Sequence, residues 1–445
     1  LEDFNFFTKY NGVAYDAELY IHDISANPYD YEIADYEYGE YLHEARLHGV
    51  FISSYSIGRN IRNSIRCQYD CKCYFTKYDY RFNGTHYLEY YIGDPVPQDF
   101  CDKGPIKHIG CCADANTYGL TQREIDEHLY NFKDYVVVHA AGNDGDIAFG
   151  YTTDITAKNS ICVGASQNTY DGMSFASERN PWFMNIVSNC TRDTCNRDNL
   201  AGFSSRGPTF DGRIKPDLVA PGDGIMTAFA LPETNAFEHC SNDRNIDSAL
   251  ARRSGTSFSA PAVAGLIALI RQYFIDGYYL SPMIPSGMLL KAVLVNSCEQ
   301  LNGTVKLGNG TYMKLDSIPV PNNFVGHGLP SLNESGLKIS LSSNEFVFGI
   351  LDTYEILDNS RLSLKLKKTK SISHAYFRLT MAWYEKPAAL YGFSMFNNID
   401  ITAVINGTTY YGNGVDGGDR KNNLEKISID HVATNEIVTI NVLGV

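Results

Sequence analysis

One apolar run constrains the fold of this chain more than any other feature. From Ser257 to Phe274 the sequence is apolar on every side of a helix, so we expect a helix that other elements enclose. Its longest nearly unbroken part, Ala260 to Ile270, contains Pro261 and is too short to cross a bilayer. We therefore predict a core helix of a folded domain and no transmembrane segment in this chain.

Strand and helix patterns alternate on the N-terminal side of this run. The segment "YVVVHAAG" (135–142) is typical of a strand buried on both faces, and Thr121 with Glu124 would form the capping box of the helix before it. Two further segments, "AELYIHDI" (17–24) and "VFISSYSIG" (50–58), are rich in β-forming residues. This alternation predicts an α/β fold with a mostly parallel sheet flanked by helices.

The pattern changes after about residue 335. Short segments of alternating polarity follow one another, and the Asn406-Gly407 pair between two of them indicates a tight hairpin. We predict an α/β domain in residues 1–335 and an antiparallel β-sandwich domain in residues 336–445. Within the first domain, residues 60–115 are rich in Cys and Tyr and lack a clear period, so we expect them to form an insertion.

Cysteines and glycosylation sequons indicate a secreted or cell-surface protein. The chain has 11 cysteines, and grouped cysteines in an oxidising compartment form disulfides. A zinc site near His86 and His108 is the competing interpretation, but the two-by-two ligand spacing of such sites is missing. The disulfide candidates are Cys67, Cys71, Cys73, Cys101, Cys111, Cys112, Cys190 and Cys195, which leaves Cys162, Cys240 and Cys298 as an odd remainder. The sequons are at Asn83, Asn189, Asn302, Asn309, Asn333 and Asn406.

The charge of the chain argues against one class of partner. The net charge is -14, and no basic stripe interleaved with aromatic residues occurs along the sequence. We therefore expect no nucleic-acid partner.

Two residues have the chemistry that a catalytic site needs. Ser257 could act as a nucleophile, and Asn143 could donate a hydrogen bond to an anion. Ser257 begins the apolar run after Gly255 and Thr256, where the N-terminus of a buried helix presents positive potential and backbone N–H groups. Asn143 follows a buried strand, at the edge where open α/β sheets bind ligands. Each residue also has a structural interpretation, since Ser caps helices and Asn143 precedes a turn-forming Asp-Gly pair.

The motifs around these two residues resemble one family. The segment "GTSFSAP" (255–261) resembles the serine signature of the subtilisin-like serine proteases, and "AAGNDG" (140–145) resembles their oxyanion-asparagine segment. Between them, "FSSRGPTFDGRIKPDLVAPG" (203–222) is similar to a strand-turn-strand of that family, in the same chain order. The resemblance extends over most of residues 11–335. The C-terminal part is similar to the β-sandwich that follows the catalytic domain in the kexin-like subset.

This resemblance implies a role for each matching residue. It makes Ser257 the nucleophile, and it makes the Asn143 side chain and the Ser257 N–H the oxyanion donors. Substrate would be an extended polypeptide bound by backbone hydrogen bonds between two chain segments. The implied substrate-binding residues are Ser56, Ile57, Gly58, Ala140, Ala141, Gly142 and Thr256.

The resemblance implies no cofactor for the chemistry, although structural calcium often accompanies the family. The segment "YYGNGVDGGDR" (410–420) places Asp416 and Asp419 among glycines, which suits an oxygen-ligand loop. A solvated hairpin turn is an equally good interpretation of this segment.

The catalytic Asp and His of the family have no counterpart in the sequence. The segment "NGVAYDAELYIHD" (11–23) resembles the family segment that follows the catalytic His. The residues that begin at Leu1 do not have the pattern of a signal peptide. His86 follows the expected substrate strand instead of preceding it; we expect His22, His43, His48 and His139 to be structural or surface residues. We therefore expect a partner, an N-terminal fragment of the same precursor that supplies Asp and His. The alternative is a catalytically inactive, subtilase-like extracellular domain for protein contacts.

Overall fold

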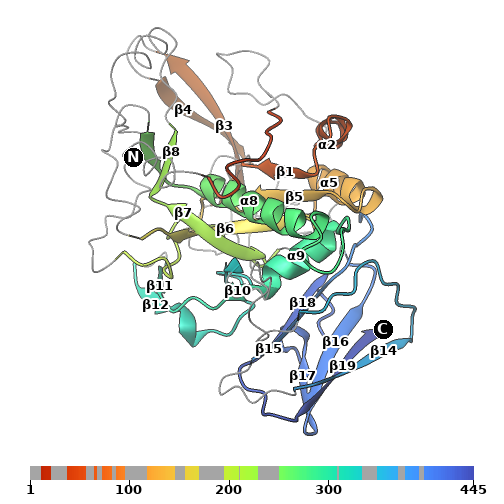
Figure 1. Cartoon of the computed structure of the whole chain (residues 1–445). Helices are drawn as coiled ribbons and strands as arrows, with labels where there is room; N and C mark the ends of the chain where they lie inside the picture. Colours follow the sequence, from red (N-terminus) through yellow and green to blue (C-terminus); the bar gives the residue numbers. More distant parts are fainter. Residues whose placement is uncertain are drawn as a thin grey trace, which may run out of the picture.

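A parallel sheet forms the centre of the chain in the computed structural model (Figure 1). Its strands stand in the order β1 (Ile52–Tyr55), β5 (Val136–Ala140), β6 (Ile161–Gln167) and β7 (Leu218–Asp223), and every pairing is parallel. This confirms the predicted α/β class. The structure describes residues 12–21, 38–56, 65–67, 73–82, 87–95, 118–145, 156–169, 195–209, 211–228, 250–307, 310–332, 348–368, 376–389 and 395–445.

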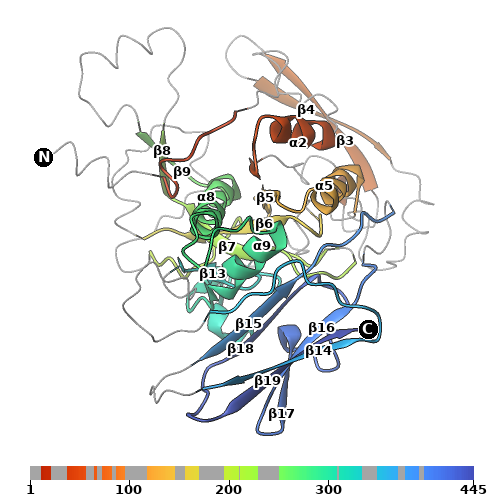
Figure 2. The same cartoon turned by 45° about the vertical axis from the view of Figure 1, so that its right-hand side comes forward.

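Helices cover both faces of this sheet (Figures 1 and 2). Those among the described residues are α2 (Tyr38–Leu47), α5 (Leu120–Asn131), α8 (Thr256–Ile275) and α9 (Gly287–Asn296). Alternate residues of β5 face opposite sides, because side chains alternate along a strand. Val136 and Val138 join α8 and α9 in one apolar cluster, and Val137 joins α2 and α5 in another.

The predicted central helix is α8. Among the described residues it is the one helix long and apolar enough to span a bilayer, by length and composition alone. Its Val263, Ile267 and Phe274 are fully buried, and they belong to the apolar cluster that contains the inner strands. The core helix of a folded domain can meet the same criteria of length and composition as a membrane span. In this fold, α8 packs on the sheet as a core helix.

Two local predictions are wrong. Residues 17–21 of the expected strand form no strand, and Leu19 and Ile21 are 84% exposed. A strand needs a neighbour for its backbone groups, and within the described part of the chain none pairs with this segment. Helix α5 begins two residues earlier than expected, because its N-cap is Gly119, whose N–H donates to the side chain of Gln122 (3.0 Å), and not Thr121.

The expected insertion contains an antiparallel three-stranded sheet of β2 (Ile65–Cys67), β3 (Cys73–Phe82) and β4 (Tyr87–Pro95). The backbone register places Cys67 opposite Cys73. The disulfide candidates Cys71, Cys101, Cys111, Cys112 and Cys190 lie outside the described residues, as do the side chains of Cys67 and Cys73. Cys195 is disulfide-bonded, and Cys162 and Cys298 are buried cysteines that form no disulfide.

The C-terminal residues form two facing antiparallel sheets, as predicted for a sandwich (Figure 2). One has the order β14 (Arg361–Lys367), β19 (Ile437–Gly444), β16 (Ile399–Ile405), β17 (Thr408–Tyr411), and the other pairs β15 (Phe377–Ala382) with β18 (Leu424–Ile429). An apolar cluster that includes Ile401 and Ile427 lies between them. The remaining short elements are β8 (Ile225–Ala228), β9 (Leu250–Arg253), β10 (Cys298–Glu299), β11 (Thr304–Lys306), β12 (Tyr312–Lys314), β13 (Leu329–Pro330), η3 (Leu315–Ser317) and η5 (Gly412–Gly414).

The Asn406-Gly407 hairpin forms as predicted. It joins Ile405 to Thr408, with φ of 50° at Asn406 and 83° at Gly407, as a type I′ turn requires. The sequon residues Asn302 and Asn406 are exposed, and the Nδ2 of Asn406 donates to Oε1 of Glu436 (2.5 Å). The other sequon residues, Asn83, Asn189, Asn309 and Asn333, lie outside the described residues.

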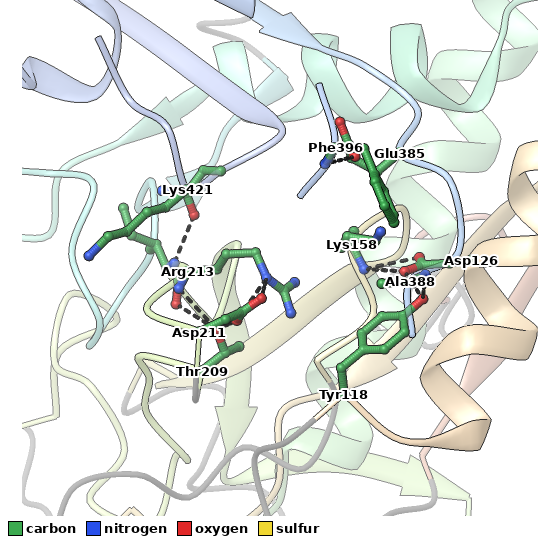
Figure 3. A network of polar contacts seen from close by, with 12 residues as sticks. Tyr118, Asp126, Lys158, Thr209, Asp211, Arg213, Glu385, Ala388, Phe396 and Lys421 are labelled. Atoms are coloured by element: carbon green, nitrogen blue, oxygen red, sulfur yellow. Dashed lines mark hydrogen bonds and ion pairs between the residues drawn. The ribbon is translucent and has the colours of Figure 1, made fainter. Parts of the chain in front are cut away.

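Buried polar contacts join the sandwich to the α/β domain. Lys426 of β18 donates from Nζ to the carbonyl oxygens of Val295 (2.9 Å) and Cys298 (2.8 Å), at the C-terminal end of α9. The side chain of Asn159 accepts from the N–H of Glu385 (2.9 Å) and donates to its carbonyl (2.8 Å). The carboxylate of Glu385 in turn accepts from the N–H of Phe396 (2.8 Å; Figure 3). Because such groups are costly to bury unpaired, these bonds fix how the two domains meet.

The predicted calcium loop has no metal arrangement among its described groups. Asp416 is exposed, and the carboxylate of Asp419 accepts hydrogen bonds from the side chains of Asn413 (2.7 Å) and Asn422 (2.8 Å) and from the N–H of Lys421 (3.0 Å). In the described ranges no group of three or more His, Cys, Asp or Glu is placed to hold a metal ion. Structural calcium stays a prediction.

A buried carboxyl in the sandwich makes its stability depend on pH. Burial raises the pKa of Glu425 from 4.5 to about 8, against the opposing hydrogen bond from the N–H of Ile401. Between these two pH values the folded state holds a proton that the unfolded chain releases, so this contribution to stability falls as pH rises through the window. We expect Glu425→Gln to gain in Tm relative to the wild type as pH rises from about 5 to about 8. A Tm difference that stays constant across this range would contradict the assignment.

Candidate active site

Ser257 lies in the first turn of α8, at the carboxyl edge of the parallel sheet. Its side chain is half-buried, and its Oγ lies 3.4 Å from the carbonyl oxygen of Ser56. The hydroxyl of Ser56 donates to the carbonyl of Ser257 (2.9 Å). The end of β1 is therefore held directly beside the predicted nucleophile, and its role in binding substrate stays a prediction. The predicted neighbours Ile57 and Gly58 lie outside the described residues.

Asn143 and Thr256 form a clamp that joins the end of β5 to the start of α8. The Oδ1 of Asn143 accepts hydrogen bonds from the N–H (2.9 Å) and the hydroxyl (3.1 Å) of Thr256. The same hydroxyl accepts from the N–H of Gly142 (3.1 Å). Because one side of the planar amide is fixed in this way, its Nδ2 is directed away from Thr256, and the Asn143 side chain is exposed.

The structure gives Thr256 a role that the sequence did not indicate. Thr256 is fully buried, and its predicted contact with substrate stays a prediction. Thr256 is a positioning residue that orients Asn143, which lies 113 positions away in the chain. No local pattern in the sequence indicates this contact, because both residues also suit ordinary cap and turn positions.

The implied substrate-binding residues Ala140, Ala141 and Gly142 lie at the end of β5 and directly after it. Ala140 and Ala141 are buried, at 6% and 0% exposure, and Gly142 is half-buried. The N–H of Ala141 donates to Val163 and the carbonyl of Gly142 accepts from Ser205. These backbone groups are therefore used within the protein, and contact of residues 140–142 with a substrate stays a prediction. Sequence reasoning missed Ser205, whose side chain also accepts from the N–H of Asp144 (3.1 Å) and holds this turn.

Glycines bring the backbones close together behind Ser257. The N–H of Gly255 donates to the carbonyl of Gly222 (2.8 Å), and a Cβ on Gly222 would collide with the hydroxyl of Ser259. Gly255 has φ of 152° and ψ of 153°, a conformation that other residues rarely adopt. The backbone path that presents Ser257 thus requires a glycine at position 255.

We expect Gly255→Ala to lower the stability of the protein by roughly 1–3 kcal/mol, because alanine is strained at this φ. Thermal unfolding should show the loss as a reduced Tm. The matched control is Gly349→Ala, at a glycine with nothing within 4 Å of an added Cβ and without a positive φ. Equal Tm values for the two variants would contradict the strained role of Gly255.

The described histidines do not bond to Ser257. His139 is fully buried and stacks on Tyr55 with ring centroids 5.3 Å apart, and burial lowers its pKa to about 3. His48 stacks on Tyr20 and His43 packs near Phe132. These contacts agree with the structural roles expected for them. His22 and His86 lie outside the described residues.

The fold, the turn that carries Ser257 and the amide beside it define a class of protein. The chain belongs to the subtilase family of serine peptidases, whose family model matches residues 4–328. Two relatives are the serine protease/ABC transporter B family proteins tagD and tagB of Dictyostelium discoideum. They are 29% identical over 43% of this chain and 14% of tagD, and 31% identical over 40% of this chain and 12% of tagB.

A further relative comes from another organism. Pyrolysin of Pyrococcus furiosus is 34% identical over 31% of this chain and 8% of pyrolysin. The chain therefore spans a small part of the length of these relatives. The crystal structure of a lanthipeptide protease overlaps with a TM-score of 0.27 at 14% identity, over 48% of this chain and 54% of that one, and we base no argument on it.

Proposed function

We propose that this chain is the nucleophile-bearing part of a secreted serine endopeptidase whose Asp and His lie upstream of Leu1. The clamp between Asn143 and Thr256 carries the proposal. It directs an amide donor beside the N-terminus of α8, one residue from Ser257. If Thr256 only capped α8, the side chain of Asn143 would not need to be held beside it with its donor group exposed.

The reaction that this arrangement supports is acyl transfer. The Oγ of Ser257 attacks the carbonyl carbon of a peptide bond, and its proton passes to the imidazole of the upstream segment. The Nδ2 of Asn143 and the N–H of Ser257 stabilise the oxyanion, the C–N bond breaks, and the imidazole protonates the leaving amine. Water then hydrolyses the acyl-enzyme and releases the second product.

Unfilled surfaces of the α/β domain support a docked upstream segment. β1 pairs with β5 on one side, and no strand among those described pairs with its other edge. Val13 packs against Gly265 of α8, whereas Leu19 and Ile21 project into solvent. An unpaired edge beside exposed apolar side chains is unfavourable in water. In the subtilase family the upstream region supplies a strand and a helix at this place.

Native mass spectrometry of the secreted gene product tests the upstream segment. We expect a polypeptide, or a cleaved and associated fragment, that brings the native mass above the 49.6 kDa of residues 1–445 before glycans. The names of tagD and tagB, which join a serine protease to an ABC transporter, support a still longer gene product. A native mass of 49.6 kDa with peptide hydrolysis intact would overturn this part of the proposal.

The second function is a catalytically inactive extracellular domain for protein contacts. It is favoured by the partner of the Ser257 Oγ, which within the described residues is a backbone carbonyl and not an imidazole. Incubation of the gene product with an unfolded protein substrate separates the two functions. We expect cleavage at internal peptide bonds; intact substrate with correctly folded protein would favour the binding function.

A further inference from the structure

An open pocket lies on the sandwich beside the Asn406-Gly407 hairpin. Its volume is about 550 Å³, within the range of about 300–1,000 Å³ that is usual for sites that bind small molecules. Asn406 and Gly407, the first two residues of the sequon Asn406-Gly407-Thr408, are among the residues that line it. The strands β14, β16 and β19 border this pocket and lie away from α8 in Figures 1 and 2. The pocket is therefore separate from the candidate active site.

A row of side chains crosses this pocket on the outer face of the sheet. In the strand register, Thr439 of β19 lies between Lys365 of β14 and Val404 of β16. Val438 and Ile440, on either side of Thr439 in the chain, belong to the apolar cluster between the two sheets. Because side chains alternate along a strand, Thr439 and its two register partners face outward, away from this core.

The lining combines apolar and hydrogen-bonding groups, as a sugar requires. The C–H groups of a sugar ring pack on aliphatic side chains, and its hydroxyls need donors and acceptors. Ile437 is 48% exposed and Val404 is half-buried, and both line the pocket. Within the described part of the chain, the side chains of Lys365 and Thr439 have no hydrogen-bond partner. Both can therefore bond to the hydroxyls of a ligand.

The amide of Asn406 is held at the edge of this pocket. Asn406 is exposed, and its Nδ2 donates to Oε1 of Glu436 (2.5 Å). The other carboxylate oxygen of Glu436 accepts from the N–H of Ala433 (2.5 Å), which anchors this carboxylate to its own turn. An asparagine amide has two hydrogens, so one can stay bonded to Glu436 when a sugar replaces the other. A glycan on Asn406 would therefore begin beside the pocket.

We propose that Asn406 carries an N-linked glycan and that this pocket holds the first sugars of the glycan against the outer face of the sheet. Because the glycan is tethered to the rim, docking is intramolecular and the weak contacts of an open pocket suffice. The docked sugars cover the exposed side chain of Ile437. This inference rests on the secretion included in the function proposed above, and it does not depend on catalysis.

Attachment uses the donor that the secretory route supplies, an oligosaccharide diphosphate carried on a lipid. The Nδ2 of Asn406 attacks the anomeric carbon of the first sugar and forms the N–C bond. The C–O bond to the diphosphate breaks, the diphosphate leaves with the electron pair, and a proton of Nδ2 passes to solvent. Thr408, which completes the sequon, is exposed as well.

Enzymatic removal of glycans from the folded gene product tests the docking. The matched control is the sequon Asn302-Gly303-Thr304, whose Asn302 is also exposed and lies outside this pocket. With peptide N-glycosidase F under native conditions, we expect release from Asn406 to be about tenfold slower than from Asn302, which corresponds to a docking free energy of about 1.4 kcal/mol. After unfolding, both glycans should be released at similar rates. Peptide mapping in ¹⁸O water measures each site, because release converts the asparagine to a labelled aspartate.

The outcomes separate this inference from the proposed function. Equal release from Asn406 and Asn302 in the folded protein would overturn the docking. A glycan at Asn302 with none at Asn406 would overturn the inference and leave secretion intact. A gene product without glycan at any sequon would contradict both the inference and the secretory route.

Variants of the lining assign the protection to the pocket. Ile437→Ser removes the apolar contact, and Lys365→Ala removes a donor at an exposed position; each should bring release from Asn406 closer to the rate at Asn302. The control is Ile284→Ser, at an isoleucine that is 70% exposed outside the pocket, and it should keep the slow release. Slow release that persists in both lining variants would contradict a glycan held in this pocket.

Discussion

Replacing Ser257 with alanine is expected to abolish peptide-bond hydrolysis by the gene product that contains this chain. The change removes the oxygen that forms the acyl-enzyme, and neither Ser56 nor Ser259 can replace it. Ser56 is committed to the carbonyl of Ser257, and Ser259 is buried and donates to Ala220 (2.9 Å). We expect kcat to fall about 10⁶-fold, the size that loss of the nucleophile has in subtilisin, another member of this family.

The fold should survive this substitution. Ser257 is half-buried, and its described Oγ contact is the long one to Ser56, so the Tm of Ser257→Ala should stay close to that of the wild type. The matched control is Ser317→Ala, at an exposed serine of η3, which should keep full activity. Residual hydrolysis of more than a few per cent with Ser257→Ala would show that another residue is the nucleophile.

The second large effect is expected at Asn143. In Asn143→Ala the oxyanion loses its side-chain donor, so we expect kcat to fall by about 10²–10³ with little change in KM. The magnitude is the one measured for the equivalent asparagine of subtilisin and is quoted for the family. Kinetics with a peptide substrate under saturating and limiting conditions separate kcat from KM.

A conservative variant separates donation from positioning. Asn143 also accepts two hydrogen bonds from Thr256, so the alanine variant removes an anchor as well as a donor. Asn143→Asp keeps an oxygen for Thr256 and removes the Nδ2 donor. We expect it to keep more of the wild-type Tm than Asn143→Ala does, with kcat at least as low. Near wild-type kcat in Asn143→Asp would contradict an oxyanion role.

Local patterns predicted the central elements of the fold correctly. The apolar strand β5, the long apolar helix α8 and the Asn406-Gly407 hairpin each depend on residues close together in sequence, which is where periodicity and turn chemistry are informative. Residues 17–21 of the strand expected at 17–24 do not form a strand. A strand needs a neighbouring strand to pair with, and none of the described strands pairs with these residues. The start of α5 depended on one Gln side chain that reaches back to Gly119.

The site was predictable as residue types but not as geometry. Ser257 and Asn143 stood in motifs, and the structure brings their segments together at the carboxyl edge of the sheet. The clamp through Thr256 and the support from Ser205 join positions far apart in the chain, which no local pattern reveals.

Reaction with a fluorophosphonate tests the central claim most directly. Such a probe forms a covalent bond with a serine hydroxyl only when a base and an oxyanion site activate it, so it reports on both at once. Peptide mapping of the labelled, correctly folded gene product should place the modification on Ser257, and Ser257→Ala should remove it. Folded protein that stays unlabelled at Ser257 would contradict the proposed peptidase and leave the binding function in its place.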